Sequence, residues 1–175
     1  MNVLLLFASI EGQTAKIAQF MADEITRLGH SPMLHEADDP TPLPVTEADA
    51  VILAAPVHQR RHPRAFEALV GGFRTSLDQR PTLMVSVSLS AAFPEGIAEA
   101  IDYVTEMSMR TRFSPREIAC VAGAVRTTQY DYFATQVIRH VVLRDRAYDP
   151  AEGEHEFTDW AELSTRLQTF LEAAA

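Results

Sequence analysis

Hydroxyl groups and unpaired backbone N–H groups come together near the start of this chain in an arrangement that suits phosphate. An apolar run over residues 3–8 leads into a short loop with Ser9 and Gly12, and a helical pattern begins at Thr14. A helix N-terminus carries free N–H groups and the positive end of the helix dipole, so it binds phosphate well. We therefore expect a phosphate site made by this loop, namely Ser9, Ile10, Glu11, Gly12, Gln13 and Thr14.

The loop differs from two other phosphate-binding loops. It lacks the Gly-x-Gly-x-x-Gly of dinucleotide sites and the Gly-Lys-Ser/Thr of a P-loop. The hydroxyls of Ser9 and Thr14 would bind the phosphate without a lysine, and Glu11 should point to solvent because its charge would repel the ligand. An ordinary strand–turn–helix junction with Thr14 as a helix cap remains open as an alternative.

A second group of residues that could do chemistry, arginines and histidines, follows residues 50–55, an apolar run typical of a buried strand. Arg60, Arg61 and Arg64 can pair with carboxylates of a substrate or of an acidic partner, although a solvated basic face before a helix would look the same. His58 and His62 are four residues apart but precede Pro63 in an expected loop. Because no third ligand is evident, we expect no metal site.

Strand-like and helix-like patterns alternate along the chain and place these loops. The strands are expected at residues 3–8, 31–36, 50–55, 82–89 and 117–125, and the helices at residues 14–28, 63–73, 95–107 and 159–173. Five strands with intervening helices predict an α/β fold, a doubly wound parallel sheet in the order 2-1-3-4-5. In that order the ligand crevice lies at the carboxyl ends of strands 1 and 3, where both loops fall.

Residues 126–156 form a long insertion after strand 5 in what we otherwise expect to be a single domain over residues 1–175. Its middle part, residues 131–146, has a broad apolar face bordered by basic residues. Such a segment can dock on the protein, dimerise or lie on a membrane surface, and docking is the commonest of these roles.

Composition narrows the class of protein. With 175 residues and 47% hydrophobic content, the chain can bury a core unaided, and its single cysteine, Cys120, rules out a disulfide framework. A net charge of −9 argues against nucleic-acid binding. The first strand begins directly after Met1 and no apolar run has spanning length, so we expect a cytoplasmic protein.

With these landmarks the chain resembles the menaquinone-dependent protoporphyrinogen IX dehydrogenases, flavodoxin-like enzymes of haem synthesis. Ser-x-x-Gly-Gln-Thr after the first strand is similar to the phosphate loop with which flavodoxins hold FMN. The insertion and the Thr-Asp-Trp at residues 158–160 that follows it also match the family. Further matching residues are Leu6, Phe7, Ile17, Ala18, Ala65, Phe66, Ser86, Val87, Leu89, Ala122, Gly123, Ala124, Arg126 and Tyr130.

The resemblance implies an FMN-dependent enzyme that oxidises protoporphyrinogen IX and passes the electrons to a quinone. Besides the phosphate loop, the expected FMN contacts are Pro56, Val57, His58, Ser88, Leu89, Ser90, Ala91, Gly123, Arg126 and Tyr130. His58, Phe93 or Tyr130 could stack on the flavin. His58 is the candidate base, and the arginines at 60, 61 and 64 are candidates for the substrate carboxylates. Residues 131–146 could then contact the inner face of the cell membrane.

Two departures from the family bear on function. Its members tend to carry Arg-Tyr where this chain has His58-Gln59, and they are often basic where this chain is acidic. A flavodoxin acting as a one-electron shuttle suits the acidic charge, and an FMN-dependent quinone reductase fed by a nicotinamide cofactor is a third possibility. A phospho-receiver and a nucleophile-elbow hydrolase are excluded, because the required Asp after strand 3 and Gly-x-Ser-x-Gly are absent.

Overall fold

A parallel five-stranded sheet forms the centre of the computed structural model, which describes residues 1–126 and 154–175. The strand order is β2-β1-β3-β4-β5, as the sequence predicted, and every neighbouring pair is parallel. The strands are β1 (Asn2–Phe7), β2 (Ser31–Glu36), β3 (Ala50–Pro56), β4 (Thr82–Ser88) and β5 (Glu117–Ala122). All residues of β3 and β4 are buried, which explains why β3 is apolar throughout and β4 is mainly apolar with small hydroxyl residues.

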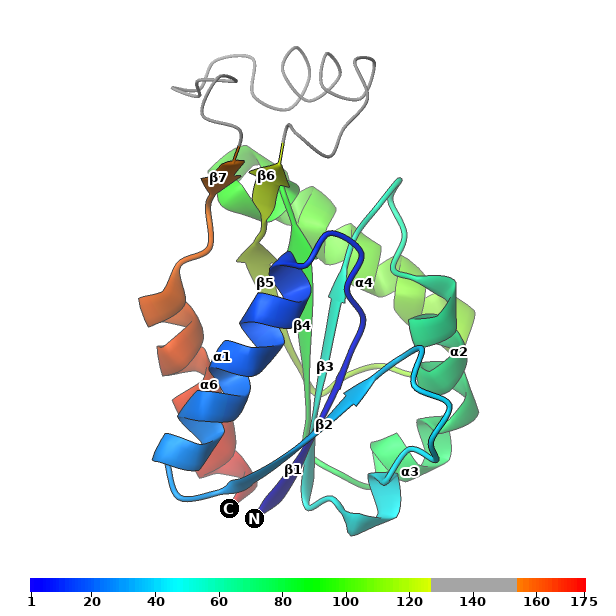
Figure 1. The fold of residues 1–175 in the computed structure, drawn as a ribbon. Coiled ribbons are helices and arrows are strands. Elements are labelled where there is room, and N and C mark those ends of the chain that lie inside the picture. Colours follow the sequence, from blue (N-terminus) through cyan, green and yellow to red (C-terminus); the bar gives the residue numbers. More distant parts are fainter. Residues whose placement is uncertain (127–153) are drawn as a thin grey trace.

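Helices cover both faces of the sheet (Figure 1). α1 (Gln13–Arg27) and α6 (Trp160–Ala174) lie on one face, and α2 (Arg64–Gly72), α3 (Arg74–Asp78) and α4 (Ile97–Thr111) on the other. Each face encloses its own apolar core, with Ile17 and Phe170 in the first and Phe66 and Met107 in the second. Both chain termini lie at the end of the sheet opposite the carboxyl ends of the strands (Figure 1).

Within the described residues, short 3₁₀ turns lie at Val45–Glu47, Ser90–Ala92 and Pro94–Gly96. The last of these changes the start of an expected helix. The helix expected at residues 95–107 is preceded by the last turn, starts at Ile97 and runs on to Thr111. The helix expected at 63–73 ends at Gly72, and the five-residue α3 that follows was not predicted.

The fifth strand is shorter than expected. β5 ends at Ala122 and Gly123 separates it from β6 (Ala124–Arg126), which pairs antiparallel with β7 (Glu154–Glu156). The N–H of Gly123 donates to the carbonyl of Ser88, and its carbonyl accepts from the N–H of Phe157. β6 and β7 therefore form a two-stranded ribbon at the carboxyl end of the sheet (Figure 1). The amphipathic segment at 131–146 and Tyr130 lie outside the described residues.

The last helix begins as its sequence predicts. Asp159 is the N-cap of α6, and its Oδ1 accepts a hydrogen bond of 2.9 Å from the N–H of Glu162.

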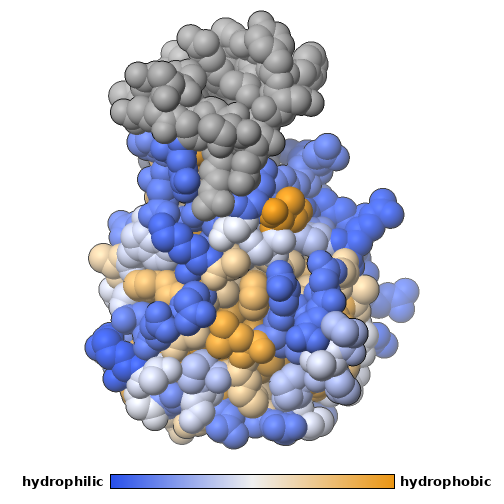
Figure 2. Space-filling model, viewed as in Figure 1, coloured by the Kyte–Doolittle hydropathy of each residue, from blue (hydrophilic) through white to orange (hydrophobic). Residues whose placement is uncertain are grey.

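The face of the molecule in Figure 2 is mostly hydrophilic, with small separate hydrophobic patches. Within the described residues, no helix is both long enough and apolar enough to cross a membrane.

Candidate functional site

A cavity of about 270 Å³ lies at the carboxyl ends of the strands. Three loops surround it: the loop from β1 to α1, the turn after β3, and the 3₁₀ turn after β4. The lining residues are Glu11, Gln13, Thr14, Pro56, Val57, His58, Gln59, Arg60, Val87, Ser88, Leu89, Ser90, Tyr103, Gly123 and Ala124. The sheet therefore brings the two sequence-predicted loops together at the expected edge.

The loop from β1 to α1 is closed by Ser9 rather than by Thr14. The Ser9 hydroxyl oxygen accepts hydrogen bonds of 3.2 Å from the N–H groups of Gly12 and Ala15. Gly12 is the N-cap of α1 and has a φ of 91°, a conformation that favours glycine. Ser9 thus satisfies two of the N–H groups at this end of the helix. Those of Gln13 and Thr14 remain for a ligand.

Gln13 presents an unpaired acceptor beside the cavity. Its Nε2 donates to Thr158 Oγ1 at 2.9 Å and to Glu156 Oε2 at 3.1 Å. The single proton of the Thr158 hydroxyl is used on the carbonyl of Ala122, so Thr158 must accept from Gln13, and this fixes the orientation of the amide. Gln13 Oε1 is then buried and has no partner among the residues that the structure describes. A ligand that fits here should donate an O–H or N–H to it.

Glu156 holds the first turn of α1 against β7 and α6. Its carboxylate forms an ion pair with Lys16 and accepts a hydrogen bond of 2.7 Å from Trp160 Nε1. The Lys16 ammonium also lies 5.2 Å from the centre of the Trp160 ring. Burial raises the pKa of Glu156, but the hydrogen bonds from Lys16, Trp160 and Gln13 outweigh burial and lower it. Lys16 is therefore directed to Glu156, and the phosphate loop depends on hydroxyl and N–H groups.

The turn after β3 forms the second wall. His58 and Arg61 exchange two backbone hydrogen bonds, of 2.9 and 3.0 Å, around a two-residue turn. The turn residues Gln59 and Arg60 have φ values of 48° and 63°. Turns of this kind favour Asn and Gly, so both residues are in a conformation that their side chains disfavour. His58, the candidate base, is partly buried and lines the cavity.

The three arginines of this region have different surroundings. Arg60 lines the cavity; its guanidinium lies 2.6 Å from Glu99 Oε1 and over the ring of Tyr103, 5.3 Å from the centre. Arg61 instead donates to Glu67, and Arg64 is exposed at the start of α2. The structure therefore brings only Arg60 of the three into the cavity lining.

His62 is part of the core and does not face the cavity with His58. It is 1% exposed, and its Nε2 lies 3.0 Å from the hydroxyl of the buried Ser86. Burial lowers the pKa of His62 to about 4, so the ring is neutral at neutral pH. In the described part of the chain, no three His, Cys, Asp or Glu side chains gather as a metal ion requires.

The turn after β4 forms the third wall through Ser88, Leu89 and Ser90. The Ser90 hydroxyl donates to Glu99 Oε2 at 3.1 Å and lies 3.3 Å from the Tyr103 hydroxyl. Ala91 lies on the other side of this turn, against a separate hollow between α4 and β5. The walls therefore combine neutral side chains with a few polar groups, as expected for a cofactor site.

The remaining site predictions are placed as follows. Ile10 is 59% exposed and, like Ser9, Gly12 and Ala91, is outside the cavity lining, whereas Glu11 is partly buried and inside it. Four lining residues were not predicted from the sequence: Gln59, Val87, Tyr103 and Ala124. Tyr103 belongs to the buried face of α4, so its residue type and spacing are those of a core residue. The structure describes Arg126 only as part of β6, and Phe93 packs on Phe157 with ring centres 5.7 Å apart.

Known proteins resemble this chain in sequence and in fold. A family model for the flavodoxin domain matches residues 4–150. The protoporphyrinogen IX dehydrogenase (quinone) of Escherichia coli strain K12 is 26% identical over 168 residues, which cover 94% of this chain and 91% of that protein. The protein of the same name from strain O157:H7 has the same values.

Solved flavodoxin structures share the fold at low identity. A short-chain flavodoxin associated with a PDU bacterial microcompartment superposes with a TM-score of 0.62 at 10% identity, over 100% of this chain and 99% of that one. The oxidised flavodoxin 1 of Bacillus cereus gives a TM-score of 0.55 at 15% identity, over 98% of both chains. At these identities the likeness concerns the fold alone.

Proposed function

The chain belongs to the flavodoxin domain family, whose cofactor is FMN, and from this premise we propose that it oxidises protoporphyrinogen IX and passes the electrons to a quinone. The observation that carries this proposal is the likeness to a protoporphyrinogen IX dehydrogenase (quinone) along 94% of the chain. A likeness over that share of the chain extends to both sides of the insertion.

The cavity suits FMN in its polar groups. We assign the phosphate to the N–H groups of Gln13 and Thr14 and to the hydroxyls of Ser9 and Thr14. The ribityl chain supplies hydroxyl donors, and the buried, unpaired Gln13 Oε1 requires one. The walls at residues 56–60 and 88–90 would enclose the flavin ring. Ile10, Gly12, Ala91, Gly123, Arg126 and Tyr130 remain proposed contacts of this site.

When bound, FMN supplies the redox chemistry, because its ring accepts hydrogen from one molecule and gives it to another. The chain itself positions the reactants. His58 lines the cavity and is our candidate to accept a proton from the substrate. Arg60 is our first candidate for a substrate carboxylate, since it lines the cavity and its partner Glu99 is 45% exposed. The exposed Arg64 is the second, and Arg61 is held by Glu67.

A purified sample with added FMN tests this proposal. Anaerobic protoporphyrinogen IX should bleach the bound flavin, and a quinone should then restore the flavin colour while porphyrin fluorescence appears. Bleaching by NADPH together with no response to porphyrinogen would instead identify a nicotinamide-fed reductase.

A one-electron shuttle is the alternative that one specific observation favours. The net charge of −9 is typical of a carrier that docks on basic partners. A shuttle would bind FMN and accept single electrons from a reductase, but it would not respond to porphyrinogen.

A further inference from the structure

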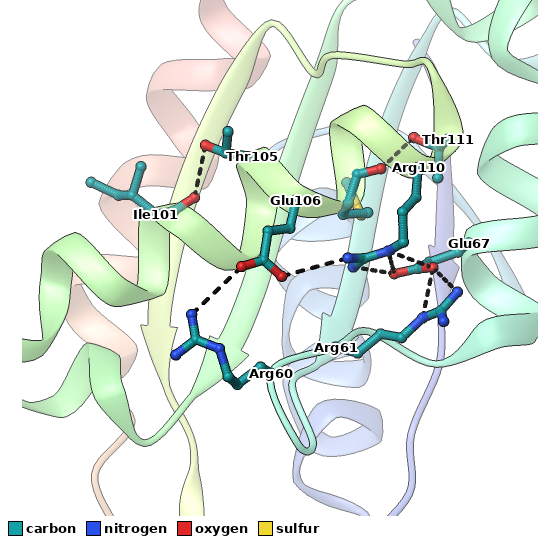
Figure 3. A network of polar contacts seen from close by, with 9 residues as sticks. Arg60, Arg61, Glu67, Ile101, Thr105, Glu106, Arg110 and Thr111 are labelled. Atoms are coloured by element: carbon teal, nitrogen blue, oxygen red, sulfur yellow. Dashed lines mark hydrogen bonds and ion pairs between the residues drawn. The ribbon is translucent and has the colours of Figure 1, made fainter.

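A buried carboxylate lies behind the turn that forms the second wall of the cavity. The Glu67 side chain, on α2, is 5% exposed and contacts two arginines at once (Figure 3). Arg61 Nη2 and Nε lie 2.7 and 3.1 Å from its Oε2. Arg110 on α4 contacts the same carboxylate through Nη2, 2.8 Å from Oε1, and through Nε. One carboxylate thus joins the turn, α2 and α4.

The network continues to the neighbouring turn residue. Arg110 lies 3.5 Å from Glu106, and Glu106 lies 3.5 Å from Arg60, as Figure 3 shows. Arg60 also pairs with Glu99 on α4. Two consecutive residues of the turn are therefore held by carboxylates, Arg61 by the buried Glu67 and Arg60 by the more exposed Glu99 and Glu106. The buried contact is the stronger of the two, because water screens the exposed pairs.

The turn needs outside support because its backbone is strained. Gln59 and Arg60 both have positive φ, and such residues keep that conformation only where their surroundings enforce it. Within the turn, the two hydrogen bonds between His58 and Arg61 are the internal restraint. Contacts that fix the Arg61 side chain therefore bear directly on whether the turn stays closed.

Glu67 carries a charge at neutral pH and can exert this hold. Burial raises the pKa of Glu67, but hydrogen bonds from Arg110 and Arg61 outweigh burial and leave the pKa below its ordinary value. A carboxylate held by two guanidiniums in this way is also fixed in direction, since each arginine presents its donors in a rigid plane.

We propose that Glu67 is a positioning residue for FMN: by holding Arg61 against α2 and α4 it keeps the His58–Arg61 turn closed beside the cavity before the cofactor binds. This inference rests on the proposed FMN site. It means that part of the ordering needed for binding is already present in the free protein, which strengthens binding. The position of the turn also shapes the surroundings of the flavin and hence its midpoint potential.

Glu67→Gln in the full chain tests the proposal, with Glu24→Gln as the matched control. Glu24 likewise accepts two hydrogen bonds from one arginine, Arg27, but lies near the end of α1 that points away from the cavity. We expect the amides of His58 and Arg61 to exchange hydrogen at least tenfold faster in FMN-free Glu67→Gln than in the wild type. We also expect about tenfold weaker FMN binding and a shifted midpoint potential. Glu24→Gln should change none of these.

A purely structural role for Glu67 makes a different prediction. The variant would then lose thermal stability, yet amide exchange in the turn, FMN affinity and midpoint potential would stay at wild-type values, which would overturn the proposal. If Glu67→Gln does not fold, Arg61→Lys replaces it, because lysine keeps the charge and loses the two-nitrogen contact. The same three measurements then decide.

A second substitution checks the link to backbone strain. Asn tolerates positive φ better than Gln, so Gln59→Asn added to Glu67→Gln should recover most of the lost amide protection and FMN affinity. No recovery would contradict the role of the turn. A wild-type protein that binds no FMN would refute the proposed function, whereas the amide exchange would still report whether Glu67 holds the turn.

Discussion

At the residue scale, three uncharged side chains are available to a phosphorylated cofactor, whereas the nearby cations are already paired with carboxylates. Ser9 accepts a hydrogen bond from the N–H of Ala15 in the first turn of α1, and Thr14 is 2% exposed and lines the cavity. Gln13 presents a buried oxygen that has no partner among the described residues. The sequence predicted Ser9 and Thr14 from their types and spacing. It could not predict the orientation of Gln13, because that depends on Glu156 and Thr158, which are distant in the chain.

The double variant Ser9→Ala with Thr14→Val should bind FMN at least tenfold more weakly, since a hydrogen bond to a charged group contributes about 1.5–3 kcal/mol. Ser9→Ala alone should also lower the unfolding free energy of the FMN-free protein by about 1 kcal/mol, because it removes the acceptor of the Gly12 and Ala15 N–H groups. Fluorescence titration with FMN and urea unfolding separate the two effects. Unchanged flavin affinity in the double variant would contradict the phosphate assignment.

His62 should make stability depend on pH. In the unfolded chain the ring takes up a proton near its ordinary pKa of 6.5, whereas in the folded protein it does so only near 4. The unfolded state therefore binds more protons between these values, and stability should fall as the pH falls from 6.5 towards 4. The full loss is on the order of 3 kcal/mol.

Urea unfolding at several pH values checks this expectation for His62, with His62→Gln as the comparison. The variant should lose most of the slope between pH 6.5 and 4, because glutamine does not titrate. An equal slope in both proteins would assign the pH dependence to other groups.

At the element scale, the sequence predicted the five strands and their order, because buried parallel strands are long apolar runs between turn residues. Local elements were harder to predict. Gly123 splits the expected fifth strand, and the second part pairs with β7, more than twenty-five residues later in the chain. α3 is too short for a periodic pattern, so nothing in its sequence distinguishes it from a loop.

Thr158 links two elements, β5 and α1, at the end of the sheet, and its loss should affect the site. Its hydroxyl donates to the carbonyl of Ala122, the last residue of β5, and accepts from Gln13 on α1. Thr158→Val keeps the shape but leaves a buried carbonyl without its donor, so we expect a loss of about 1–3 kcal/mol in unfolding free energy. FMN should also bind several-fold more weakly, because Gln13 loses one of the two acceptors that orient it.

Thr165→Val is the matched control, since the Thr165 hydroxyl donates to a carbonyl within exposed α6. It should leave FMN affinity unchanged. If Thr158→Val binds FMN as tightly as this control, the orientation of Gln13 does not matter for the cofactor.

At the scale of the whole molecule, all loops of the proposed FMN site lie at one end of the sheet. The carboxyl ends of β1, β3 and β4 supply the walls, and the β6–β7 ribbon stands at the same end (Figure 1). The topology predicted this edge, because ligands of such sheets bind where the strand order reverses. The sequence could not predict that Tyr103 lines the cavity or that carboxylates hold Arg60 and Arg61. Both features depend on how α2 and α4 pack against the turn.

The central claim is that porphyrinogen reduces the FMN of this protein directly. The most direct measurement mixes FMN-loaded protein with protoporphyrinogen IX in an anaerobic stopped-flow cell and records flavin absorbance and porphyrin fluorescence together. We predict that porphyrinogen alone bleaches the flavin, and that a quinone added afterwards restores the flavin colour while porphyrin accumulates, because the oxidation of porphyrinogen to porphyrin needs several turnovers of a two-electron cofactor. A flavin that stays oxidised in the presence of porphyrinogen, before any quinone is added, would contradict the claim.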